Sequence, residues 1–129
     1  MDLVAVAEVD GEMAGLGRLV SIDGTTGELG GMYVPPAFRG RHVATAIVSY
    51  LLQHSPYERL FCIPFTHLAN FYAEFGFQPV PTRTAVPAAV AEKVGWCEKE
   101  YPAKVQLLLR TAHGADSTVR SEYRNSLLN

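Results

Sequence analysis

The sequence lacks most features that mark secreted and membrane proteins. Among 129 residues it has only two cysteines, Cys62 and Cys97, which are too few for a disulfide framework. Reduced thiols in a cytoplasmic protein are therefore the expectation. No apolar run approaches the ~18 residues that a transmembrane helix needs. The first ten residues contain no Lys or Arg, unlike a secretory signal.

The chain also lacks an excess of basic residues. Its 11 Lys and Arg against 13 Asp and Glu give a net charge of −2, which argues against a general nucleic-acid binder. The 48% of hydrophobic residues and 19% of charged residues are typical of a globular chain with a core. The length corresponds to one domain.

Three strands are predicted within the first 34 residues. Two β-rich segments, 3–9 and 13–21, flank Asp10-Gly11, which is a strong hairpin signal. A third strand is predicted over 28–34, and its internal glycines indicate a bulge or a close approach of another backbone.

Hydrophobic periodicity and turn residues predict the remaining elements. Further strands are expected at 60–63, 77–80 and 105–109, and helices at 43–52, 68–75 and 87–100. This order predicts an α+β or α/β fold in which helices pack on one sheet. We expect a single domain over residues 1–110 and a polar C-terminal tail or arm over 111–129.

A basic loop precedes the first predicted helix. The first N–H groups of a helix have no intrahelical partner, and with the helix dipole they form an anion site. Arg39 and Arg41 add charged donors, so the segment predicts capture of a pyrophosphate; the alternative is a solvated basic turn. The chain has neither the nucleotide P-loop motif nor the Gly-x-Gly-x-x-Gly dinucleotide motif.

Two segments resemble one known family. Residues 38–44, Phe-Arg-Gly-Arg-His-Val-Ala, resemble the acetyl-CoA loop of the GNAT superfamily of N-acetyltransferases, whose pattern is Gln/Arg-x-x-Gly-x-Gly/Ala. Residues 68–77 resemble the family's Leu-Tyr-x-x-x-Gly-Phe segment. The order and spacing fit over residues 3–110. The resemblance implies acetyl-CoA as co-substrate, no metal, and a mixed, mostly antiparallel sheet that is flanked by helices and splayed at the cofactor site.

The resemblance also implies which residues contact the cofactor. They lie at the end of the third strand, in the basic loop and in the first helical turn: Met32, Tyr33, Val34, Arg39, Gly40, Arg41, His42, Val43, Ala44 and Thr45.

Acyl transfer to an amine needs a base, donors for the oxyanion and a donor for the leaving thiolate. Glu28 is the predicted base; the alternative is an exposed acid at a strand edge. The resemblance implies that the N–H of Val34 donates to the oxyanion. Tyr72 aligns with the family's tyrosine and is the predicted acid, which protonates the leaving thiolate or at least donates a hydrogen bond to it; the alternative is that it only belongs to the apolar stripe of its helix.

Other chemistries are disfavoured by the residues present. Cys97 has no visible partner base for covalent catalysis. His54, His67 and His113 have no ligands at metal-binding spacing, so no metal is expected.

Two hypotheses follow. The first is an enzyme that moves an acetyl group from acetyl-CoA to the amine of a small molecule or amino acid by direct attack on the thioester, without nucleic-acid or membrane partners. The second is a non-catalytic GNAT-fold module that binds CoA or a protein. It is motivated by two departures: His42 stands at the family's central loop glycine, and Phe65 stands where the family often has Asn.

The resemblance further implies a short form of the family. Family members usually begin with a strand and one or two helices, which form part of the acceptor wall, whereas this chain begins at the hairpin. The acceptor site is then open, closed by a second subunit or by residues 111–129, or incomplete through truncation. A partner subunit could pair with the uncovered first strand, so a homodimer is one of the open alternatives.

Overall fold

The computed structural model describes residues 2–81 and 83–112. Its strands are β1 (Leu3–Val9), β2 (Glu12–Ser21), β3 (Thr26–Tyr33), β4 (Arg59–Cys62), β5 (Gln78–Pro79) and β6 (Leu108–Thr111). Its helices are α1 (Val43–Gln53), α2 (Ala69–Ala73) and α3 (Ala88–Glu100), with two short 3₁₀ turns, η1 (Pro36–Phe38) and η2 (Thr66–Leu68). Hydrogen bonds join the strands in the order β1-β2-β3-β4-β6-β5. The mixed, mostly antiparallel sheet confirms the predicted fold class.

The described residues group into two compact units. The first contains residues 2–21 and 29–56, and the second contains residues 22–28 and 57–112 apart from residue 82. Strand β3 begins in the second unit and continues in the first.

The hairpin of the first unit forms where the sequence predicts it. Asp10 and Gly11 have φ values of 52° and 80°, the two positive φ angles of a type I′ turn, and Val9 pairs directly with Glu12. This turn matches the twist of antiparallel strands. The register shifts once, between Ala7 and Glu8.

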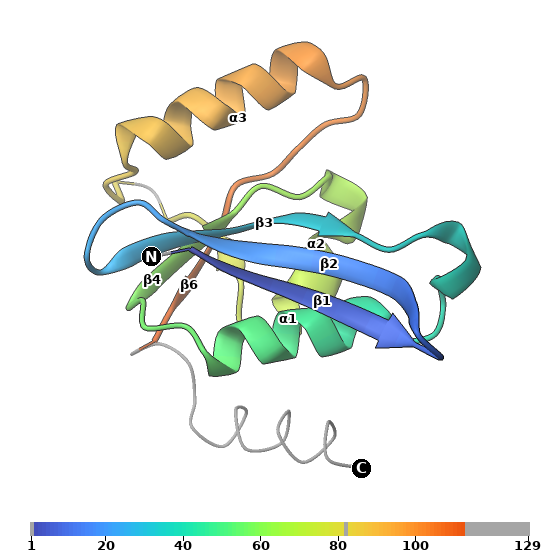
Figure 1. Cartoon of the computed structure of the whole chain (residues 1–129). Coiled ribbons are helices and arrows are strands. Elements are labelled where there is room, and N and C mark those ends of the chain that lie inside the picture. Colours follow the sequence, from blue (N-terminus) through green and yellow to red (C-terminus); the bar gives the residue numbers. More distant parts are fainter. Residues whose placement is uncertain (1, 82, 113–129) are drawn as a thin grey trace. The chain divides into compact units, whose positions relative to one another are not determined.

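Helix α1 packs closely against the β1–β2 hairpin (Figure 1). A Cβ atom added at Gly15 would lie 2.9 Å from Ile47 Cδ1, and one at Gly17 would lie 2.9 Å from Ile47 Cγ2. Ile47 and Leu51, four residues apart and thus on one face of the helix, are buried, so this apolar face is the one that packs. The two glycines allow the helix to approach the strand.

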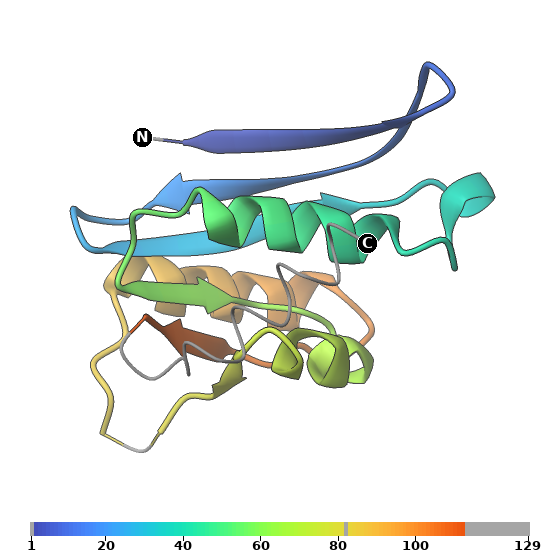
Figure 2. The same cartoon turned by 90° about the horizontal axis from the view of Figure 1, so that it is seen from below.

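In the second unit, strands and helix α3 share a small core. Thr25 O accepts hydrogen bonds from Glu58 N at 2.9 Å and Arg59 N at 3.2 Å, which joins the beginnings of β3 and β4 as in a parallel pair. Strand β4 pairs antiparallel with β6 (Figure 2). Val90 of α3 packs against Phe61 of β4 and Leu109 of β6.

The segment around α2 ends at Gly76, directly after the predicted helix over 68–75. Gly76 has a φ of 92°. Its N–H donates to Ala73 O at 3.0 Å, and Phe77 N–H donates to Tyr72 O at 3.2 Å. These two bonds are the pattern of a Schellman motif.

The last strand begins later than predicted. The sequence suggested 105–109, whereas β6 is Leu108–Thr111, because the regular pairing of β4 with β6 ends at Cys62 and Leu108. Pro64 has no N–H to continue the ladder, and beyond it only an isolated bridge joins Phe65 to Val105.

Two expectations about the whole chain stay predictions. Most of the predicted tail, residues 113–129, lies outside the described residues, and the single domain over 1–110 is untested. None of the helices within residues 2–81 and 83–112 is long and apolar enough to cross a membrane.

Candidate functional site

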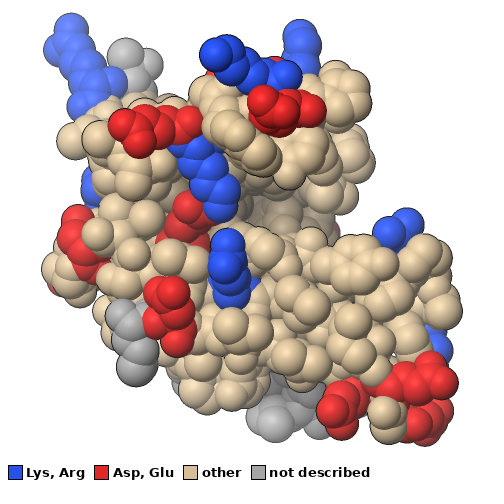
Figure 3. All heavy atoms as spheres, turned by 45° about the horizontal axis from the view of Figure 1, so that its top comes forward, with Lys and Arg blue, Asp and Glu red and all other residues tan. Residues whose placement is uncertain are grey.

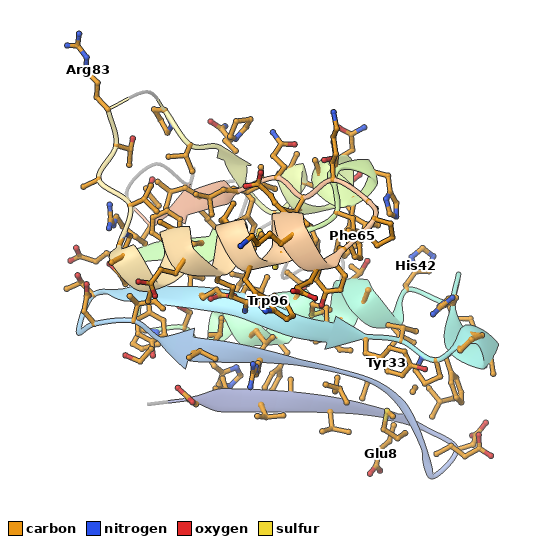
Figure 4. All side chains as sticks on the ribbon, turned by 90° about the horizontal axis from the view of Figure 1, so that it is seen from above. Glu8, Tyr33, His42, Phe65, Arg83 and Trp96 are labelled. Carbon is orange, nitrogen blue, oxygen red and sulfur yellow. The ribbon has the colours of Figure 1, made fainter. Side chains whose placement is uncertain are left out.

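The predicted cofactor segment occupies one continuous stretch of the first unit. It runs from the end of β3, which carries Tyr33, through the loop to the start of α1, where His42 lies (Figure 4). Gly40 and His42 have φ values of 76° and 61°, so the chain turns twice through the left-handed region before the helix begins. Arg39 Nε donates to Val34 O at 3.0 Å, which ties the loop to the end of the strand.

The first turn of α1 has free backbone donors. The N-cap, His42, makes no side-chain capping bond, and the N–H of Ala46 bonds to His42 O at 3.1 Å. The amides of Val43, Ala44 and Thr45 come before this bond and so have no partner four residues back. Arg41 is exposed, with its guanidinium 5.5 Å from the Phe38 ring centroid. These groups fit an anion such as a pyrophosphate.

Glu28 lies in the second unit, in the first half of β3. Its side chain is 9% exposed and forms an ion pair with Lys93 of α3. The alternative interpretation of Glu28, an exposed acid at a strand edge, is therefore wrong. A buried charge needs such a partner, because removal from water penalises the ionised form.

Tyr72 lies on α2 in the same unit and is buried. Its ring makes edge-to-face contacts with Phe71 and Phe77, with centroids 5.0 and 6.0 Å away. Burial raises the pKa of Tyr72 far above its usual range, and the nearby Cys62 thiolate would raise it further. Tyr72 is therefore a protonated hydrogen-bond donor at neutral pH.

Cys62 links the surroundings of Tyr72 and Glu28. Burial raises the pKa of the Cys62 thiol far above its usual range, with a further increase from the negative charge of Glu28. The predicted base and the predicted donor are thus both close enough to Cys62 for their charges to act on it. A buried, protonated thiol is a poor nucleophile, and Cys62 belongs to the buried core.

Phe65 stands where the family often has Asn and takes part in an aromatic cluster. Its ring contacts Tyr101 edge-to-face with centroids 5.4 Å apart and stacks on His67 at 6.0 Å. Tyr101 in turn contacts Trp96 at 5.7 Å. Figure 4 shows Phe65 near the C-terminal end of α3, the helix that carries Trp96. Aromatic packing therefore surrounds the side chain at this position.

Lys93 is the polar residue that the sequence analysis missed. It is 65 positions from Glu28 in sequence, and no local motif points to it. The helix that carries it was predicted, but only the folded chain places the ammonium at the carboxylate.

Neither the charged residues on the face drawn in Figure 3 nor the metal-ligating residues among 2–81 and 83–112 form a second site. On the face drawn in Figure 3, the Lys and Arg side chains lie among Asp and Glu without a continuous basic patch. No group of three or more His, Cys, Asp or Glu within residues 2–81 and 83–112 could hold a metal ion.

Comparison with known proteins decides the family. A family model described as an acetyltransferase (GNAT) domain matches residues 2–79. The chain belongs to the GNAT acetyltransferase family. Membership supports acetyl transfer in general, which agrees with the expectation from residues 38–44 and 68–77. Among curated proteins, no sequence matches the chain.

Solved structures of proteins that bind CoA or acetyl-CoA share its fold. Mycobacterium tuberculosis Rv2747, in complex with CoA and NLQ, has a TM-score of 0.68 and 24% identity over 84% of this chain and 75% of its own. A GNAT acetyltransferase of Elizabethkingia anophelis with acetyl-CoA bound has a TM-score of 0.66 and 15% identity over 84% of this chain and 74% of its own.

A longer enzyme shares the fold as well. N-acetylglutamate synthase of Neisseria gonorrhoeae, complexed with coenzyme A and N-acetyl-glutamate, has a TM-score of 0.68 and 18% identity. The match covers 85% of this chain but only 26% of the synthase.

Proposed function

We propose that this GNAT protein transfers the acetyl group of acetyl-CoA to the amine of a small molecule or amino acid. The observation that carries the proposal is the buried carboxylate of Glu28, ion-paired with Lys93. A buried carboxylate beside the acceptor can take the proton of its ammonium, directly or through water, and the ion pair holds this side chain in position. The first-turn amides of α1, those of Val43, Ala44 and Thr45, supply the donors for the CoA pyrophosphate.

The reaction has a simple balance. The acceptor ammonium gives a proton to Glu28, and the amine nitrogen attacks the thioester carbon. The carbon–nitrogen bond forms, the carbon–sulfur bond breaks, and the nitrogen loses a second proton to solvent as it becomes an amide. CoA leaves as a thiolate that takes up one proton from solvent, and Glu28 returns its proton to solvent. Direct proton transfer from Tyr72 is unfavourable, because its raised pKa lies well above the ~8.5 of a thiol. Tyr72 is therefore assigned as a hydrogen-bond donor to the thiolate.

Two variants test these roles by measurement of CoA release from acetyl-CoA over a panel of amines. Tyr72→Phe and Glu28→Gln should each lower kcat about 100-fold, since a hydrogen-bond donor to a developing negative charge and a general base each contribute at least about this much. The affinity for CoA, measured by isothermal titration, should change little. Tyr50→Phe and Glu98→Gln, on exposed residues, are the matched controls.

Other results would contradict the proposal. Full rates in both variants would remove the assigned roles. CoA binding without turnover of any amine would favour the non-catalytic binding module, which the presence of His42 at the loop-glycine position motivates. Failure to bind CoA at millimolar concentration would contradict both hypotheses.

A further inference from the structure

The ion pair of Glu28 and Lys93 is unequally exposed. The side chain of Glu28 is 9% exposed and that of Lys93 is 41% exposed. An ammonium has three N–H donors, and within the described residues Glu28 is the one hydrogen-bond partner of Lys93. Lys93 therefore has donors left for a ligand while it remains beside the carboxylate.

Helix α3 holds Lys93 in place. Val90, three residues before it, is fully buried against the sheet, and Cys97, four residues after it, is buried as well. On a helix these positions flank Lys93 on neighbouring turns. The ammonium thus extends from a fixed backbone, and the residue is well placed to recognise a ligand.

The charges of Glu28 and Lys93 make some acceptors electrostatically more favourable than others. If Glu28 receives the acceptor ammonium, a second cation arrives beside Lys93. A plain amine then leaves two cations around one anion, and like charges at short range repel. An acceptor that carries a carboxylate next to its amine places an anion against Lys93, so that the four charges alternate.

We propose that Lys93 determines acceptor specificity by binding the carboxylate of an α-amino acid whose amine faces Glu28. This inference rests on the proposed function, since it uses Glu28 as the base for the same acceptor. It goes beyond it by naming the α-amino acid as the preferred substrate class and Lys93 as the residue that selects it.

The first experiment compares matched acceptors on the wild-type protein. The pairs are L-leucine with isoamylamine and L-phenylalanine with phenethylamine, which differ only in the carboxylate. The ratio of kcat/KM, amino acid over amine, should be at least about 10, since a charge-assisted hydrogen bond contributes enough for such a factor. A ratio of about one or below overturns the proposal.

The second experiment removes the cation. Lys93→Met should reduce that ratio about 10-fold or more, because the lost contact is one that only the amino acid makes. Lys93→Arg should keep the ratio above one, since it keeps the charge. Lys99→Met, on an exposed lysine of the same helix, should leave it unchanged. If Lys93→Met slows both acceptors equally, Lys93 only positions Glu28 and the proposal is wrong.

A binding measurement separates this inference from the proposed function. Trp96 is the single tryptophan of the chain; it is 54% exposed and lies three residues from Lys93 on α3, so its fluorescence reports on ligands at this helix. L-leucine should change the emission saturably in the wild type and far more weakly in Lys93→Met. This result without any acetyl transfer would support the inference while the proposed function fails. Equal responses in the two proteins, or no response in the wild type, would overturn the inference.

Discussion

The backbone of His42 has φ 61° and ψ 21°, the left-handed conformation that glycine adopts without strain. The GNAT pattern has glycine at this position, and the chain keeps the glycine conformation although the side chain has changed. The departure therefore costs conformational energy but leaves the amides of the first helical turn in place. Because these amides keep their geometry, we expect the loop to bind an anion although histidine replaces glycine.

His42→Gly should raise the free energy of unfolding by about 0.5 kcal/mol. Removal of a side chain from the left-handed region recovers about 1–2 kcal/mol, and the greater chain entropy of glycine offsets about 0.5–1 kcal/mol of this. Urea denaturation measures the change. CoA affinity should stay within about twofold, because the donors are backbone groups. A large loss of affinity would show instead that the imidazole itself contacts the cofactor.

At the same scale, the sequence described Glu28 and Tyr72 only in part. Spacing and resemblance pointed to both residues, and the structure shows that both are buried. The sequence could not show the ion pair with Lys93 or the influence of Cys62, because these depend on contacts between residues far apart in the chain. Their catalytic roles stay predictions.

Among the elements, α1 and β2 depend on glycines for their close packing. A Cβ on Gly17 would meet Met32 Sδ, Ile47 and Leu51, with Leu51 Cδ1 at 3.3 Å. The sequence predicted both elements, but nothing in it indicated that these glycines face the helix.

Gly17→Ala should lower the free energy of unfolding by about 1–3 kcal/mol, the usual cost of an additional group in a packed core. Gly24→Ala is the matched control, since a Cβ there meets nothing within 4 Å. Urea denaturation of both variants measures the difference. Equal stabilities would show that α1 shifts away from β2 without cost.

Element boundaries were the weakest part of the sequence analysis, for identifiable reasons. The Schellman motif at Gly76 ends its helix as predicted. By contrast, β6 begins three residues later than predicted. Pro64, two residues after the end of β4, has no N–H to continue the hydrogen bonds between β4 and β6. A strand boundary of this kind depends on the neighbouring strand, which the local sequence does not contain.

At the scale of the whole molecule, the buried thiol of Cys62 and the buried phenol of Tyr72 make the stability depend on pH. The folded protein raises the pKa values of Cys62 and Tyr72 above their unfolded values of about 8.5 and 10. Below these unfolded values both groups are protonated in both states and their contribution is complete. As pH rises further, the unfolded chain releases protons that the folded protein keeps, so stability falls.

The free energy of unfolding should therefore fall as pH rises above about 8.5, by up to about 1.4 kcal/mol per pH unit for each group. Urea denaturation in reductant at about pH 7.5, 9 and 10 measures the slope. Cys62→Ala should flatten the curve below about pH 10, where the thiol contributes most. An unchanged slope in this variant would contradict the assignment to Cys62.

The sequence by itself determined the parts of this protein that depend on neighbours in the chain. The Asp10-Gly11 hairpin, the apolar face of α1, the helix stop at Gly76 and the basic loop before α1 all follow from short-range propensities and patterns. With the family resemblance they led to the GNAT family. Only the tertiary structure decided the burial and the charged neighbours of the predicted catalytic residues, because these arise when segments far apart in the sequence meet. The fold buried Glu28 and Tyr72 and raised the pKa of Tyr72. It also brought Lys93 of α3 to the carboxylate of Glu28 on β3, which the proposed reaction needs.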